Sequence, residues 1–114
     1  PRIEEDLSAM RTQPIHAMIL AEVRPECRAE ALEVLTEMVD LCRQEEGCLR
    51  FDLYCDEKHP SLLNTIEEWD CLESHTRHLE SRLVESRILS LIGKFKGLPT
   101  VRILSPLNEL AEEA

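Results

Sequence analysis

The sequence predicts an α+β protein with a ferredoxin-like βαββαβ fold and one four-stranded antiparallel sheet. Short segments rich in Ile, Val and Leu alternate with longer segments of helical periodicity, in the order strand, helix, strand, strand, helix, strand. The pattern divides into two similar halves, and right-handed connections would place the first and third strands side by side in the middle. Both helices would then cover one face of the sheet.

The first expected strand, Ile15 to Val23, is apolar on both of its faces. One face carries Ile15, Ala17, Ile19, Ala21 and Val23, and the other carries Met18 and Leu20. Such a strand is typical of a sheet that is buried on both sides. Since the helices cover one side only, the simplest cover for the other is a second copy of the chain. The sequence therefore predicts a homodimer packed sheet to sheet.

The first helix and the second strand follow. Pro25 suits a first helical turn, and residues Glu26 to Glu46 have helical periodicity that ends at Gly47. The inward stripe of this helix is Leu32, Leu35, Val39 and Cys42. Apolar and polar residues then alternate from Cys48 to Cys55, which predicts a half-buried strand.

A polar loop leads into the third expected strand, Leu62 to Trp69. Helical periodicity then runs from Leu72 to about Phe95, with Leu72, Leu79 and Leu83 on the inward side of its first part. One helix or two are equally compatible, because the stripe shifts near Ser81. Gly93, Gly97 and Pro99 end the helical region, and Thr100 to Leu104 form a short last strand.

Length and composition indicate one soluble domain. The chain has 114 residues, of which we assign 1–14 to an N-terminal extension, 15–104 to the folded domain and 105–114 to an acidic tail. A formal net charge of −10 argues against a nucleic-acid partner. No apolar run approaches the roughly 18 residues of a membrane helix, so we expect no membrane partner and a cytoplasmic location. Five cysteines without a C-x-x-C pair indicate reduced thiols.

The charge is unevenly distributed along the chain. Acids dominate between Glu26 and Glu46, and basic residues dominate between Arg77 and Arg102. Solvated helix faces explain this distribution, and so do complementary surfaces in an oligomer.

The candidate functional residues gather where the third strand meets the following helix. Glu67 and Trp69 lie two apart on the strand and so share a face. A carboxylate on a mostly apolar face is either a structural ion or hydrogen-bond partner or a base with a raised pKa. Trp69 is a core anchor or the wall of a site for a flat ligand. His75 and His78 are candidate acid/base groups or structural histidines.

Two further assignments concern the same junction. Cys71, His75 and His78 fall on one helical stripe and could bind a metal, but no fourth ligand is evident, so we predict none. Asn64 lies with Ile66 on the strand face opposite Glu67, where its amide would hold a ligand oxygen or satisfy the sheet interface.

These residues resemble the antibiotic biosynthesis monooxygenase domain over about Ile15 to Leu104. The likeness rests on the order Pro25-Glu26, Glu46-Gly47-Cys48-Leu49 with Phe51 and Tyr54, Glu67-x-Trp69, and His78 nine residues past the tryptophan. Members of that family are dimeric α+β barrels. The resemblance implies a monooxygenase that needs no cofactor and oxidises a planar phenolic, anthrone or quinol-type small molecule with dioxygen.

By position, the resemblance implies catalytic roles for Glu67, Trp69 and His78 and makes Asn64 a candidate for substrate binding. We also expect His75 to bind the substrate, although the family does not imply this. His75 stands where a leucine is common in the family, which would make the site more polar. Haem-degrading relatives use an Asn on the first strand and a His on the last helix; here the first strand has no Asn, and Ile88 stands near that His position. The alternative to an enzyme is a non-catalytic dimeric small-molecule-binding or stress-associated module of the same fold.

Overall fold

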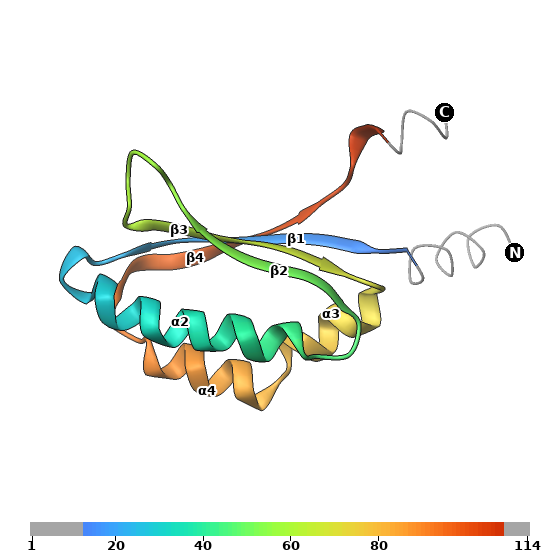
Figure 1. Ribbon diagram of the computed structural model, residues 1–114, viewed down its shortest axis with the longest axis horizontal. Coiled ribbons are helices and arrows are strands. Elements are labelled where there is room, and N and C mark those ends of the chain that lie inside the picture. The colour runs from blue at the N-terminus through green and yellow to red at the C-terminus, as the bar shows by residue number, and fades with distance from the viewer. Residues whose placement is uncertain (1–12, 109–114) are drawn as a thin grey trace, which may run out of the picture.

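The computed structural model describes residues 13–108, and a single four-stranded antiparallel sheet organises them (Figure 1). The strand order is β2-β3-β1-β4, with β1 and β3 in the centre as predicted. The elements are β1 (Ile15–Val23), the short 3-10 helix η1 (Pro25–Cys27), α2 (Arg28–Arg43), β2 (Cys48–Cys55), β3 (Leu62–Trp69), α3 (Leu72–Leu79), α4 (Arg82–Ser90) and β4 (Phe95–Leu104). The first three strands have the predicted bounds, and the ferredoxin-like fold is confirmed.

The core lies between the sheet and the helices, which all cover one face of the sheet (Figure 1). Val23, Phe51, Leu63 and Trp69 enter the core from the sheet, and the rings of Phe51 and Trp69 meet edge to face with centroids 6.4 Å apart. The helices supply Ala31, Leu35, Met38, Val39, Cys42, Val84 and Leu91. The predicted stripe of α2 is therefore largely confirmed, because Leu35, Val39 and Cys42 are buried and Leu32 is partly buried.

The second helical region differs from its prediction. It forms two helices that part near Ser81, whose side chain accepts a hydrogen bond from the Val84 N–H and so caps α4. The expected inward residues Leu72, Leu79 and Leu83 are 45%, 50% and 37% exposed, so that prediction is wrong. The buried face of α3 is instead polar and carries Ser74, His75 and His78. Acidic side chains pair with two of these residues: Asp70 with Ser74, and Glu45 and Glu67 with His78.

The bounds of α2 and β4 also differ from those expected. Glu26 lies in the 3-10 turn that precedes α2, and α2 ends at Arg43. β4 begins at Phe95 rather than Thr100, although it contains Gly97 and Pro99. The strand accommodates them as an irregularity. Lys96 pairs with Glu22 and Thr100 with Leu20, so the three residues 97–99 of β4 lie opposite the single residue Ala21 of β1.

Some acids of the acidic segment form ion pairs with basic residues of the same chain. Glu37 of α2 pairs with Arg87 of α4 at 2.7 Å, and Glu30 pairs with Lys94 at 3.1 Å. These contacts join acids of the first half to basic residues of the second. Ion pairs at the surface contribute little stability. These two join α2 to α4 and to the segment that follows α4.

The sheet face away from the helices is uncovered within residues 13–108 (Figure 1). Its central strands carry Met18, Leu20, Leu62 and Ile66, and Leu20 is 38% exposed. None of the helices described is long and apolar enough to span a bilayer. The predicted extension and acidic tail fall mostly outside the described residues, and the domain division remains a prediction.

Candidate functional site

Glu67 lies in β3 on the side of the sheet that the helices cover. Exposure alternates strictly along this strand: Leu63, Thr65, Glu67 and Trp69 are buried, and Leu62, Asn64, Ile66 and Glu68 are half-buried on the other face. The shared face of Glu67 and Trp69 is thus confirmed. Asn64 lies on the opposite face, as predicted, and the structure does not bring it together with the other candidate residues.

The Glu67 carboxylate is buried and accepts two hydrogen bonds. Thr65 Oγ1 donates at 2.7 Å and Trp69 Nε1 at 3.0 Å. The Thr65 hydroxyl itself accepts the Ile19 backbone N–H at 3.0 Å, which leaves its own proton free for Glu67. Since the indole N–H is only a donor, both oxygens of Glu67 face donors. This arrangement suits an ionised carboxylate and offsets the cost of burying it.

His78 of α3 reaches into the same layer and lies between two carboxylates. Its Nδ1 is 2.6 Å from Glu45 Oε2, and its Nε2 is 3.8 Å from Glu67 Oε1. The ring packs on Trp69, with centroids 4.5 Å apart, and against the edge of Phe51 at 5.5 Å. The imidazole is therefore held in one orientation by aromatic neighbours, with a carboxylate at each nitrogen.

His75 lies one helical turn before His78 and is also buried. Its ring centroid is 6.2 Å from that of Trp69 and 6.4 Å from that of His78. Burial lowers the pKa of His75, the Glu67 charge opposes this effect, and His78 adds to it. His75 is therefore a neutral imidazole near pH 7, and the structure brings it together with Glu67, Trp69 and His78.

A tight junction at Gly47 holds α3 in place. Gly47 has a positive φ of 86°, and its carbonyl accepts the Asp70 N–H at 2.8 Å. A Cβ at this position would lie 2.2 Å from Ser74 Oγ, so a larger residue does not fit. Ser74 in turn donates to the Asp70 carboxylate, and this hydrogen bond, with a weaker one from Cys71, lowers the pKa of Asp70. The close approach of Ser74 therefore explains why residue 47, in the E-G-C-L stretch, is a glycine.

The three residues that the sequence suggested as possible metal ligands, Cys71, His75 and His78, do not form a group of converging ligand atoms. Cys71 is the residue before α3, its thiol contacts Ser74 Oγ at 3.5 Å, and it does not group with His75 and His78 as possible metal ligands. A different group, Cys42, Glu45 and His78, places its possible ligand atoms within 4.8 Å of one another. However, the 2.6 Å between Nδ1 and Oε2 is a hydrogen bond, shorter than the roughly 3.3 Å between two ligands of a tetrahedral zinc ion. Burial and the nearby Glu45 also raise the pKa of Cys42 to about 12, which keeps it a thiol.

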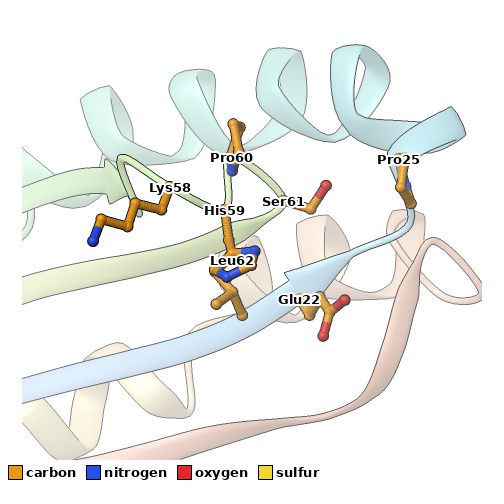
Figure 2. Close-up of a pocket in the computed structure, with 7 residues that line it drawn as sticks. All are labelled: Glu22, Pro25, Lys58, His59, Pro60, Ser61 and Leu62. Carbon is orange, nitrogen blue, oxygen red and sulfur yellow. The ribbon is translucent and has the colours of Figure 1, made fainter.

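Two surface clefts among the described residues lie away from this cluster. One of about 410 Å³ opens at the far end of the sheet, between Glu22, Pro25 and the loop at residues 58–62 (Figure 2). A second lies over α4, beside Arg82 and Leu89. Neither is lined by a residue of the Glu67 cluster.

One contact of the site was not foreseen from the sequence. Glu45 stands 33 residues before His78, and only the fold brings them together. Its sole sequence signal is its place two residues before Gly47, at the end of the expected helix. Thr65 was expected on the face of Glu67, but its role as a donor to that carboxylate depends on the Ile19 N–H of the neighbouring strand.

Comparison with known proteins gives one family and a consistent fold. The family model of antibiotic biosynthesis monooxygenases matches residues 14–86. A solved antibiotic biosynthesis monooxygenase superposes with a TM-score of 0.77 at 24% identity, covering 81% of this chain and 97% of that one. A conserved protein of Methanosarcina mazei superposes with a TM-score of 0.77 at 21% sequence identity, covering 85% of this chain and 96% of that one. A protein of Mycobacterium tuberculosis superposes with a TM-score of 0.76 at 21% identity, covering 82% of this chain and 95% of that one. A search of curated protein sequences finds no match.

Proposed function

Because the chain belongs to the antibiotic biosynthesis monooxygenase family, we propose that it is a monooxygenase that oxidises a planar phenolic, anthrone or quinol-type small molecule with dioxygen. The observation that carries this proposal is the buried Glu67 carboxylate. It accepts hydrogen bonds from Thr65 and Trp69 and faces His78. A proton acceptor inside an aromatic layer is what such a substrate needs in order to become electron-rich.

The chemistry can be written for anthrone as the substrate, with no cofactor. A base removes a proton from the ring methylene, and the resulting anion passes one electron to dioxygen. The two radicals combine into a carbon–oxygen bond, and the outer oxygen takes up a proton. Loss of the second methylene proton then breaks the oxygen–oxygen bond and leaves anthraquinone and water. One oxygen atom enters the product and the other leaves as water, so atoms and electrons balance.

Each site residue has a part in this scheme. Glu67 and His78 are the two groups that accept and return protons, since their Oε1 and Nε2 atoms face each other at 3.8 Å. Trp69 fixes the carboxylate through its N–H and holds the His78 ring that packs on it. His75, neutral and stacked nearby, contacts the substrate. Asn64 lies behind the sheet from this group, where it suits the alternative role of satisfying the sheet interface.

An open apolar strip beside Glu67 is the proposed binding surface. Ala17 of β1 pairs with Glu67 on one side and Ile103 of β4 on the other, so the three share the helix-facing side of the sheet. Yet Ile103 and Val101 are 58% and 49% exposed. Adjacent strands lie about 4.8 Å apart, so Ile103 stands about 10 Å across the sheet from Glu67. A flat ligand on this strip would direct one edge past the small Ala17 side chain toward the carboxylate.

Oxygen uptake with anthrone and naphthohydroquinone tests the proposal. We expect uptake above the spontaneous rate, reduced about 100-fold or more in Glu67→Gln and in His78→Ala. Glu68→Gln is the matched control, because Glu68 is the next residue of β3 but lies on the other face of the sheet. Equal rates for Glu67→Gln and Glu68→Gln would remove Glu67 from the chemistry.

A second function is favoured by one observation. Glu67, Trp69, His75 and His78 are at most 4% exposed, and partners within the chain occupy both oxygens of Glu67. That packing also fits a non-catalytic dimeric module in which the cluster only stabilises the fold. In that case neither compound is consumed, and His78→Ala lowers stability without changing ligand binding.

We also propose that the chain forms a homodimer through the uncovered sheet face. The apolar side chains of that face follow the two central strands, where Met18 and Leu20 stand beside Ile66 and Leu62. The neighbouring part on β2 is polar, with Asp52 paired to Arg50 at 2.6 Å. An apolar centre with a polar rim is typical of a protein interface. A sedimentation mass near one chain at micromolar concentration would contradict the dimer.

A further inference from the structure

Glu45 occupies a fixed position at the edge of the site. It follows α2, where its N–H donates to the Cys42 carbonyl at 3.1 Å and its own carbonyl accepts the Cys48 N–H at 3.1 Å. Its side chain is 22% exposed, compared with 2% for His78 and 1% for Glu67. Of these three groups, Glu45 is therefore the one that meets solvent.

The contact with Glu45 determines which nitrogen of His78 carries a proton. An ionised carboxylate only accepts hydrogen bonds, so at 2.6 Å the Nδ1 atom must be the donor. In the neutral ring, Nε2 then keeps its lone pair. That nitrogen faces Glu67 Oε1 at 3.8 Å, which is too long for a hydrogen bond and leaves the lone pair free to take a proton.

The other neighbours of the His78 ring fix it without competing for its nitrogens. Trp69 and Phe51 pack against its faces and edge. His75 lies 6.4 Å away between ring centroids. The Cys42 thiol is near both Glu45 and His78 and remains protonated, because its pKa is raised to about 12. Glu45 and Glu67 are thus the charged groups that face this ring.

We propose that Glu45 is the positioning residue of His78: by accepting the Nδ1 proton it sets the tautomer and aims Nε2 into the site. This inference rests on the proposed function for its catalytic meaning. Its structural content, a Glu45–His78 pair with a defined tautomer, is independent of any substrate. The arrangement follows the general logic of a carboxylate that orients a histidine base.

Nuclear magnetic resonance of the protein with isotope-labelled histidine tests the pair directly, because ring-nitrogen shifts report the tautomer. In the neutral ring of His78, we expect the proton on Nδ1. In Glu45→Gln the neutral amide no longer attracts the Nδ1 proton as a carboxylate does, so a larger share of His78 should carry its proton on Nε2. Glu46→Gln is the control, since that neighbouring side chain is 86% exposed, and it should leave the tautomer unchanged. A wild-type proton on Nε2, or the same tautomer in Glu45→Gln, would overturn the inference.

Kinetics with naphthohydroquinone test the consequence for turnover. Glu45→Gln should lower kcat about 100-fold with little change in KM, whereas Glu46→Gln should match the wild type. Glu45→Asp keeps the carboxylate and should recover part of kcat together with the Nδ1 tautomer. A Glu45→Gln enzyme with the altered tautomer and full kcat would refute the positioning role. If the wild type oxidises neither this compound nor anthrone, the proposed function fails, and the tautomer alone decides whether Glu45 orients His78.

Discussion

Replacing Gly47 with alanine should destabilise the protein far more than the same change at Gly93. Both glycines have a positive φ, 86° and 83°, so both substitutions carry the backbone strain of a left-handed residue, about 1–2 kcal/mol. Only Gly47 has close neighbours: a new Cβ would lie 2.2 Å from Ser74 Oγ and 2.5 Å from Ser74 Cβ. At Gly93 no atom lies within 4 Å.

The magnitude follows from what must move. Ser74 is buried on the inner face of α3, so displacing it resembles overpacking a core, which costs about 1–3 kcal/mol. Adding the strain gives about 2–5 kcal/mol for Gly47→Ala, against about 1–2 kcal/mol for Gly93→Ala. The effect of each substitution on the unfolded chain is common to both and cancels in the comparison.

Urea unfolding followed by circular dichroism measures the difference. Protomer concentration must be kept equal, because dimerisation would make stability concentration-dependent. Adding Ser74→Gly to Gly47→Ala should recover about 1–3 kcal/mol relative to additivity, since it removes two of the three clashing atoms and leaves only Asp70 Oδ1. Equal losses for the two glycine variants, or strict additivity with Ser74→Gly, would refute the steric account of this junction.

Three further predictions use other parts of the molecule. The pKa of His75 is lowered in the folded state, so the unfolded chain binds a proton at His75 more readily than the folded protein does. The stability contribution of His75 is therefore complete above its unfolded pKa of about 6.5 and declines below it. Between about pH 7.5 and about pH 5.5, the unfolding free energy of His75→Leu should fall less than that of the wild type. In native protein near pH 8, the exposed Cys55 should be alkylated rapidly and the Cys42 thiol only after unfolding, as mass spectrometry of the labelled peptides would show; fast labelling of Cys42 would contradict its burial. Leu20→Glu should halve the mass seen by sedimentation, whereas an unchanged dimer would place the interface elsewhere.

Much of the fold was predictable because its strands carry strong local signals. The alternation from Cys48 to Cys55 and the apolar run from Ile15 to Val23 gave the observed bounds of two strands. The failure at β4 has a clear reason: Gly97 and Pro99 normally interrupt a strand, and here they occupy an irregularity opposite Ala21 that only the pairing with β1 reveals.

The polar site was less predictable, because its contacts join residues far apart in the chain. Periodicity placed the leucines of α3 inside, whereas Ser74, His75 and His78 are the residues it buries. His78 can be buried here because Glu45 and Glu67 lie beside its two ring nitrogens. Neither acid is within one helical turn of His78 in the sequence. Hydrophobic pattern alone contains no information about such a pair. Glu67 and Trp69 were found because two residues of one strand need no tertiary information to share a face.

Oxidation of naphthohydroquinone or anthrone under isotopically labelled dioxygen shows whether this chain is a monooxygenase that uses Glu67. With anthrone, we expect one labelled oxygen atom in the quinone product and the other in water. The rate should be lost in Glu67→Gln and retained in Glu68→Gln. Circular dichroism of both variants would show that they fold. Absence of enzyme-dependent uptake with either compound, or equal incorporation in the two variants, would contradict a monooxygenase built on the buried Glu67 and His78.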